Sequence, residues 1–201
     1  MSTTHESRRE GGRYSTVSIL LHWTIALAIV TQIFLGWRMT DMERSTAQFE
    51  LYQLHKSVGI SILLLSLVRL GWRLTHPAPP LPEHMRGWER LLARATHVAF
   101  YVLMIGMPLL GWALVSASPY NVPTLLWDAI PWPHLPWLAD LDRDSKKETS
   151  DLLETIHSKG AWVIIGVLAL HVAGALKHQF LDRDTVLWRM LPLVPRPRRD
   201  G

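Results

Sequence analysis

The hydrophobic residues of this chain are grouped into long runs that contain no charged side chain. Residues 17–37 form one such run of 21 residues, and residues 95–127 form another of 33. A helix needs about 20 predominantly apolar residues to cross the hydrocarbon layer of a bilayer. These two runs therefore predict membrane-spanning helices.

Two further segments have shorter charge-free centres. Residues 57–68 are flanked by Lys56, Arg69 and Arg73, whose long stems we expect to snorkel outward and so lengthen the span. Residues 160–176 lie between two lysines. The sequence thus predicts an all-α membrane protein, a four-transmembrane-helix bundle with spans at about 17–37, 54–74, 95–116 and 157–178.

The distribution of lysine and arginine predicts the orientation of the bundle. Four spans put both termini on one side, where 14 of these residues lie, against 7 on the other. Cytoplasmic loops carry the excess of basic residues, so we expect both termini to be cytoplasmic. The predicted organisation is a tail at 1–16, the bundle at 17–182 and a basic tail at 183–201. Residues 117–155 are expected to form a folded or interface-hugging outer loop, followed by a short helix that leads into the fourth span.

Composition narrows the chemistry. Charged residues are 19% of the chain, below the roughly 25% usual in soluble proteins. Cysteine is absent, which excludes disulfides, thiolate metal sites and covalent attachment of haem. The net charge of +4 follows from the basic cytoplasmic loops, so we expect the lipid bilayer and no nucleic acid as a partner.

Four of the ten histidines lie in or at the edge of predicted spans. An ionisable residue inside a membrane is costly and is a functional candidate by default. The span directions place His22 and His171 near the cytoplasmic face, and His55 and His157 near the outer face. Positions 157 and 171 are also about 21 Å apart on one face of a helix. We therefore expect two pairs, His22–His171 and His55–His157, while His97 is read as interfacial.

Two neutral imidazoles at one depth suit haem iron, which they ligate from opposite sides. Such ligation leaves no position for dioxygen and favours electron transfer. Each histidine alone could instead serve in packing or hydrogen bonding. Zinc would need a third or fourth ligand, and a proton relay normally includes an acidic residue, but no acidic residue lies at membrane depth. The pattern favours two non-covalent, bis-histidine haem b groups.

Several motifs also resemble a known family. They are Tyr14-Ser-Thr-Val-Ser-Ile-Leu-Leu-His-Trp, Leu54-His-Lys-Ser-Val-Gly, Ile156-His-Ser-Lys-Gly-Ala, Leu170-His-Val-Ala-Gly-Ala-Leu-Lys-His and Leu187-Trp-Arg-Met. Together, over residues 14–192, they resemble the prokaryotic cytochrome b561 family. The resemblance implies a two-haem protein of the bacterial inner membrane that exchanges electrons with ubiquinone in the respiratory chain. It also implies iron ligands at His22, His55, His157 and His171, and one member type oxidises superoxide.

Other residues are candidates for binding at the two faces. Lys56, Lys159 and Arg38 lie at the outer mouth, where they could bind haem propionates or attract superoxide; snorkelling at the interface is the alternative. His178, beside Lys177, lies seven residues after His171. A histidine with a pKa near 6.5 can donate a hydrogen bond and relay protons, so we expect His178 and Lys177 to contact quinone.

The resulting hypothesis is an oxidoreductase-like electron carrier between an outer donor and ubiquinone. A haem-b membrane-anchor subunit of a larger dehydrogenase or hydrogenase is the alternative, in which a peripheral redox partner would bind the bundle. A homodimer is compatible with either hypothesis. A non-haem structural or transport bundle is the third hypothesis, and it would be colourless.

Overall fold

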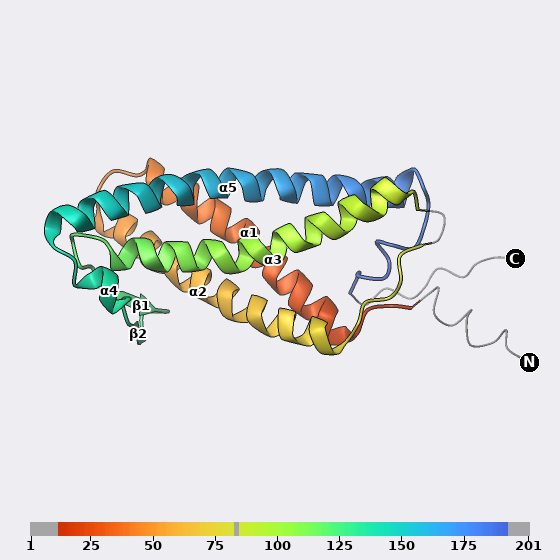
Figure 1. Cartoon of the computed structure of the whole chain (residues 1–201), viewed down its shortest axis with the longest axis horizontal. Helices are drawn as coiled ribbons and strands as arrows, with labels where there is room; N and C mark the ends of the chain where they lie inside the picture. The colour runs from red at the N-terminus through yellow and green to blue at the C-terminus, as the bar shows by residue number, and fades with distance from the viewer. Residues whose placement is uncertain (1–11, 83–84, 193–201) are drawn as a thin grey trace, which may run out of the picture.

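The computed structural model describes residues 12–82 and 85–192. Its main elements are four long helices, each long and apolar enough to cross a membrane. They lie alongside one another as an elongated bundle (Figure 1). The helices are α1 (Thr16–Asp41), α2 (Thr46–Thr75), α3 (Gly87–Ser116) and α5 (Arg143–Phe180). The prediction of four long apolar helices is confirmed.

Every long helix extends beyond its predicted span because polar capping groups, and not the apolar run, set where it begins. Ser15 Oγ accepts a hydrogen bond from the Ser18 amide at 3.2 Å, and Ser45 caps α2 in the same way. Asp142 accepts from the amides of Asp144 and Ser145 at 3.0 Å each. These contacts satisfy amides that the first turn leaves unbonded. As a result, α5 begins at Arg143 and runs through the short helix expected before 155 into the span predicted at 157.

The outer loop contains a feature that the all-α prediction missed. Strands β1 (Thr124–Leu126) and β2 (Ile130–Trp132) form an antiparallel hairpin, followed by the short helix α4 (Pro136–Ala139). Prolines at 123, 131, 133 and 136 disfavour a long helix here. Trp127 and Asp128 close the turn with φ values of 53° and 56°. Such values are uncommon for residues with bulky side chains, so the turn needs support from its surroundings.

That support comes from α2. Ser57 is 1% exposed, and its Oγ accepts a hydrogen bond from the Trp127 amide at 2.9 Å while donating to the Gln53 carbonyl at 2.8 Å. The Gln53 side chain in turn donates to the Pro123 carbonyl at 2.9 Å. The outer loop is therefore folded against the bundle, as the sequence predicted.

The packing of the bundle is uneven. Helix α1 packs along α2, α3 along α5, and α2 against α3. The buried apolar cluster comes from α1, α2 and α3, and consists of Ile25, Ile29, Leu35, Val58, Ile62 and Met104. The buried residues of α5 are Lys146 and Ser150, both near its start. Large apolar side chains such as Leu27 and Val102 are 69% and 64% exposed, an outer surface suited to lipid and not to water.

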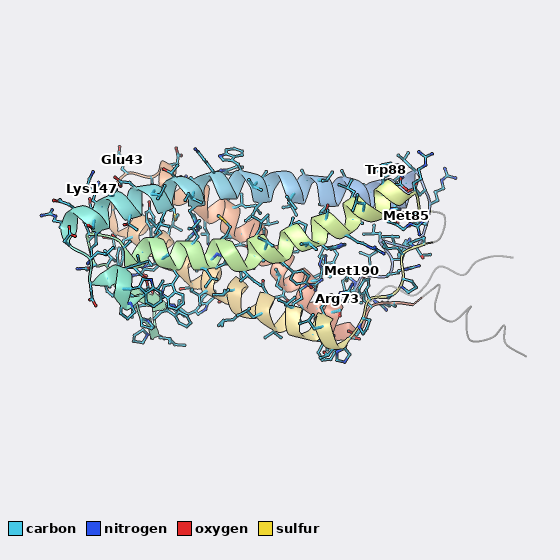
Figure 2. The ribbon with its side chains drawn as sticks, viewed as in Figure 1. Glu43, Arg73, Met85, Trp88, Lys147 and Met190 are labelled. Atoms are coloured by element: carbon cyan, nitrogen blue, oxygen red, sulfur yellow. The ribbon has the colours of Figure 1, made fainter. Side chains whose placement is uncertain are left out.

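The two ends of the bundle differ. At one end, hereafter the hairpin end, lie β1, β2 and α4; at the other, hereafter the terminal end, lie the start of α1 and the end of α5 (Figure 1). At the terminal end the chain after α5 folds back, since Trp23 Nε1 donates to the Met190 carbonyl at 2.8 Å and Arg189 donates to the Pro80 carbonyl at 2.6 Å. Figure 2 shows Met190 at this end together with Arg73 and Met85.

Part of each predicted tail lies among the described residues. Residues 183–192 belong to the folded terminal end, whereas residues 1–11 and 193–201 lie outside the described residues. The side of the membrane on which the termini lie stays a prediction from the distribution of lysine and arginine.

Replacing Ser57 by Ala should destabilise the hairpin end. The Trp127 amide then loses its partner in a buried position, which costs about 1–3 kcal/mol. We expect a lower thermal unfolding midpoint in detergent and faster proteolysis within residues 124–132. Ser61→Ala is the matched control, because Ser61 Oγ donates only to the Ser57 carbonyl of its own helix. Equal behaviour of the two variants would contradict the anchoring role of Ser57.

Candidate functional site

The four histidines selected by depth meet as two pairs. His22 of α1 faces His171 of α5 with ring centroids 6.1 Å apart and an interplanar angle of 60°. His55 of α2 faces His157 of α5 with centroids 6.2 Å apart and an angle of 68°. The first pair lies toward the terminal end and the second toward the hairpin end. Helix α5 therefore supplies one ring to each pair.

Glycines make room for the rings of the hairpin-end pair. A Cβ atom on Gly36 of α1 would lie 3.7 Å from His55 Cε1. A Cβ atom on Gly111 of α3 would lie 3.1 Å from His157 Cε1, closer than a side chain is normally accommodated. The ring of His157 therefore packs directly on the backbone of α3, which restricts its orientation.

In the hairpin-end pair, two buried ring nitrogens have no hydrogen-bond partner among the described residues. They are Nδ1 of His55 and Nδ1 of His157, and no side chain or backbone group of the described residues bonds to either. Buried polar groups are nearly always paired, so these two atoms call for an explanation. Rings whose positions serve a ligand, and not the packing of the protein alone, would account for both.

The spacing of the pairs fits a shared metal ion. Two imidazoles bonded to one metal at about 2.0–2.1 Å each have ring centroids roughly 6 Å apart. Both separations are close to this value. Each pair of imidazoles would therefore fit haem iron, which would supply one-electron redox chemistry.

A third histidine joins the terminal-end pair. His97 of α3 lies with its ring centroid 5.6 Å from that of His171, at an interplanar angle of 77°. Phe100 contacts the same ring edge-on at 5.3 Å. The sequence did not indicate this contact, because it joins α3 to α5 through residues far apart in the chain. The interfacial position of His97 stays a prediction.

Arg69 contacts α1, where its Nη1 donates to the Ser18 carbonyl at 2.8 Å. Outward snorkelling of its stem stays a prediction. Nη2 lies 3.5 Å from Nδ1 of His22. A charged group at membrane depth is tolerated when backbone carbonyls accept its hydrogen bonds, and Ser18 provides one here.

The predicted cations of the outer mouth are dispersed. Lys56 Nζ donates to the Pro123 carbonyl at 3.2 Å, beneath the hairpin. Lys159 and Arg38 are exposed, and Arg38 lines a surface hollow with Asp41. The sequence missed Lys146, which is 7% exposed and donates to Asn121 Oδ1 at 2.9 Å.

His134 reports the positive charge at the hairpin end. Partial burial lowers the pKa of His134, and the nearby ammonium group of Lys56 lowers it further, with a smaller contribution from Lys146. The Nε2 atom of His134 is buried without a hydrogen-bond partner among the described residues. Lys56 and Lys146, hereafter the hairpin-end cations, thus lie close enough to His134 to disfavour its protonation.

At the terminal end, His178 is held by carboxylates. Its Nδ1 lies 2.7 Å from Asp184 Oδ2 and 3.1 Å from Asp182 Oδ2. Lys177 forms ion pairs with Asp182 at 2.6 Å and Glu89 at 2.8 Å. The two predicted quinone contacts therefore belong to one polar network that joins α5 to the start of α3.

Comparison with known proteins gives a consistent family. The model of a family described as prokaryotic cytochrome b561 matches residues 13–193. "Cytochrome b561 homolog 2" of Escherichia coli (strain K12) is 31% identical over 181 residues, which cover 89% of this chain and 91% of the relative. "Cytochrome b561 homolog 1" of the same organism is 26% identical, covering 90% and 97%. "Probable superoxide oxidase CybB" of Yersinia pestis is 26% identical, covering 90% and 96%.

Replacing Lys56 by Gln should raise the pKa of His134. Removing a positive neighbour makes protonation of the imidazole less costly, so its titration moves upward. Histidine NMR titration of the protein in micelles, assigned with a His134→Gln variant, measures this shift. Lys147→Gln is the control, because Lys147 is exposed and pairs with Asp151. An unchanged His134 titration in the Lys56 variant would show that the charge of Lys56 does not act on the pKa of His134.

Proposed function

Because the chain belongs to the prokaryotic cytochrome b561 family and its histidines form two facing pairs, we propose that it is a membrane-bound di-haem b-type cytochrome. It carries electrons across the bacterial inner membrane between a donor on the hairpin side and ubiquinone. Family membership implies haem b; the number of haems and their ligands belong to the proposal. The observation that carries it is the metal-bridging separation of both ring pairs.

The proposed iron ligands are His22 with His171 and His55 with His157. When bound, haem b supplies one-electron redox chemistry, and two imidazole ligands leave no coordination position for dioxygen. The protein supplies the placement. Because His157 and His171 lie about 21 Å apart along one rigid helix, the two sites are held at different depths in the membrane.

The hairpin end suits a small anionic donor. Lys56 and Lys146 lie under the outer loop, while the exposed Lys159 and Arg38 extend the positive field at the surface. Such a field raises the local concentration of an anion and speeds its association. One relative bears the name probable superoxide oxidase, so superoxide is the donor that we propose for this chain.

The terminal end suits quinone chemistry. Reduction of a quinone consumes protons, and a histidine can deliver them at neutral pH. The contact with Asp184 fixes the ring of His178 and favours a proton on its Nδ1. Lys177 supports the same network through Glu89 and Asp182. With both termini in the cytoplasm, as we propose, this end faces the cytoplasm.

Single histidine replacements test the ligand assignment by counting haem per purified chain. We expect His22→Ala to lose the haem of the terminal end and keep the other. His97→Ala should keep both, because His97 is proposed to pack against His171 and not to ligate iron. Loss of one haem in the His97 variant together with retention of both in the His22 variant would transfer the ligand role to His97.

His178→Ala should separate quinone chemistry from cofactor binding. We expect both haems to remain and the rate of ubiquinone reduction to fall about 10²-fold, a typical loss when a proton-transfer group is removed. The rate is measured in proteoliposomes with superoxide as donor. Glu89→Gln serves as control, because it disturbs the same network through Lys177 without touching His178. Equal rates in His178→Ala and wild type would exclude His178 as the quinone contact.

Co-purification of an iron–sulfur partner with wild type would favour the alternative role as a membrane-anchor subunit.

A further inference from the structure

Arg69 is a partly buried cation to which the proposed function assigns no role. It leaves α2 and reaches α1, where Nη1 donates to the Ser18 carbonyl at 2.8 Å and Nη2 comes within 3.5 Å of His22 Nδ1. Its further polar neighbours include the side chains of Tyr101 of α3 and Tyr14. No carboxylate of the described residues lies within ion-pair distance of it. Guanidinium does not lose its proton in proteins, so the charge is permanent.

The carbonyl that accepts the hydrogen bond of Arg69 lies one helical turn before His22. Ser18 lies four residues before His22, so in the helix its oxygen already accepts the backbone amide of His22. A carbonyl oxygen has two lone pairs, and Arg69 takes the second. A metal-bound histidine normally donates its free ring N–H to a carbonyl or carboxylate, which makes the ring a stronger electron donor. Beside His22, the group printed nearest to ring Nδ1 is instead a guanidinium, which can only donate.

The hairpin-end pair has no such neighbour. The charge of Arg69 acts on both His22 and His171. Among the described side chains, no cation acts comparably on His55 or His157. Lys56 follows His55 in sequence, but its ammonium group is turned to the Pro123 carbonyl of the outer loop. The two pairs are alike in ring geometry and differ in electrostatic surroundings.

We infer that Arg69 raises the reduction potential of the haem held by His22 and His171 above that of the haem held by His55 and His157. The iron centre carries one more positive charge when oxidised than when reduced. A fixed cation beside its ligand therefore disfavours the oxidised form, and the low dielectric of the bundle strengthens the effect. This inference rests on the proposed function and gives it a direction, in which electron transfer from the hairpin end to the terminal end is downhill.

A redox titration of the holoprotein, followed by its visible spectrum, tests the inference. Wild type should titrate as two components. In Arg69→Gln we expect the higher component to shift downward so that its reduced-to-oxidised ratio at a given potential falls about tenfold, equivalent to about 59 mV for one electron. The lower component should not move. Arg69→Lys, which keeps the charge, should recover most of the shift. Arg73→Gln is the control, because Arg73 is exposed one turn further along α2.

Variants that keep only one haem assign the components and do not depend on the stability of Arg69→Gln. His55→Ala should leave the terminal-end haem, and His171→Ala the hairpin-end haem. We expect the remaining haem of His55→Ala to have the higher potential. An equal or lower potential there, or an Arg69→Gln variant with both components unmoved, overturns the inference. A wild-type protein without haem would instead refute the proposed function, so the two failures are distinguishable.

Discussion

The structure depends on one constraint, the cost of placing imidazole rings in an apolar interior without partners. An unbonded polar group in such surroundings costs several kcal/mol, so the unpaired ring nitrogens of His55 and His157 are not explained by packing alone. Each ring of α5 meets a ring of α1 or α2, and glycines on α1 and α3 make room for the hairpin-end pair. The apolar core is built from α1, α2 and α3, while α5, outside that core, brings its two histidines to the same partners.

The same constraint explains why the ends of the bundle are specialised. At the hairpin end, polar groups of α2 bind loop carbonyls, which folds residues 124–132 onto the bundle and holds Lys56 beneath them. At the terminal end, carboxylates hold His178 and Lys177. Arg69 donates a hydrogen bond to the carbonyl of Ser18, one turn before His22. Positive charge thus lies close to the rings at the terminal end and away from them at the hairpin end. This difference in nearby positive charge would give two sites of similar ring geometry a preferred direction of electron transfer.

The parts of the structure that follow from a local sequence pattern could be predicted. Charge-free runs predict four apolar helices, and the depth of each histidine predicts which rings meet; both agree with the structure. The long helices extend beyond the predicted spans because Ser15, Ser45 and Asp142 cap them outside the apolar runs. The hairpin, the contact of Arg69 with α1 and the contact of His97 with His171 depend on groups distant in sequence. No periodicity along one segment reports such contacts.

Each facing histidine pair is proposed to hold one haem. The haem content of the purified wild-type protein, combined with its dithionite-reduced minus oxidised spectrum, tests this proposal. We expect two non-covalent b-type haems per chain, both low-spin because both irons would have two imidazole ligands. One haem per chain would mean that one pair is structural and that no relay spans the bundle. A folded protein without haem would exclude haem-mediated electron transfer altogether.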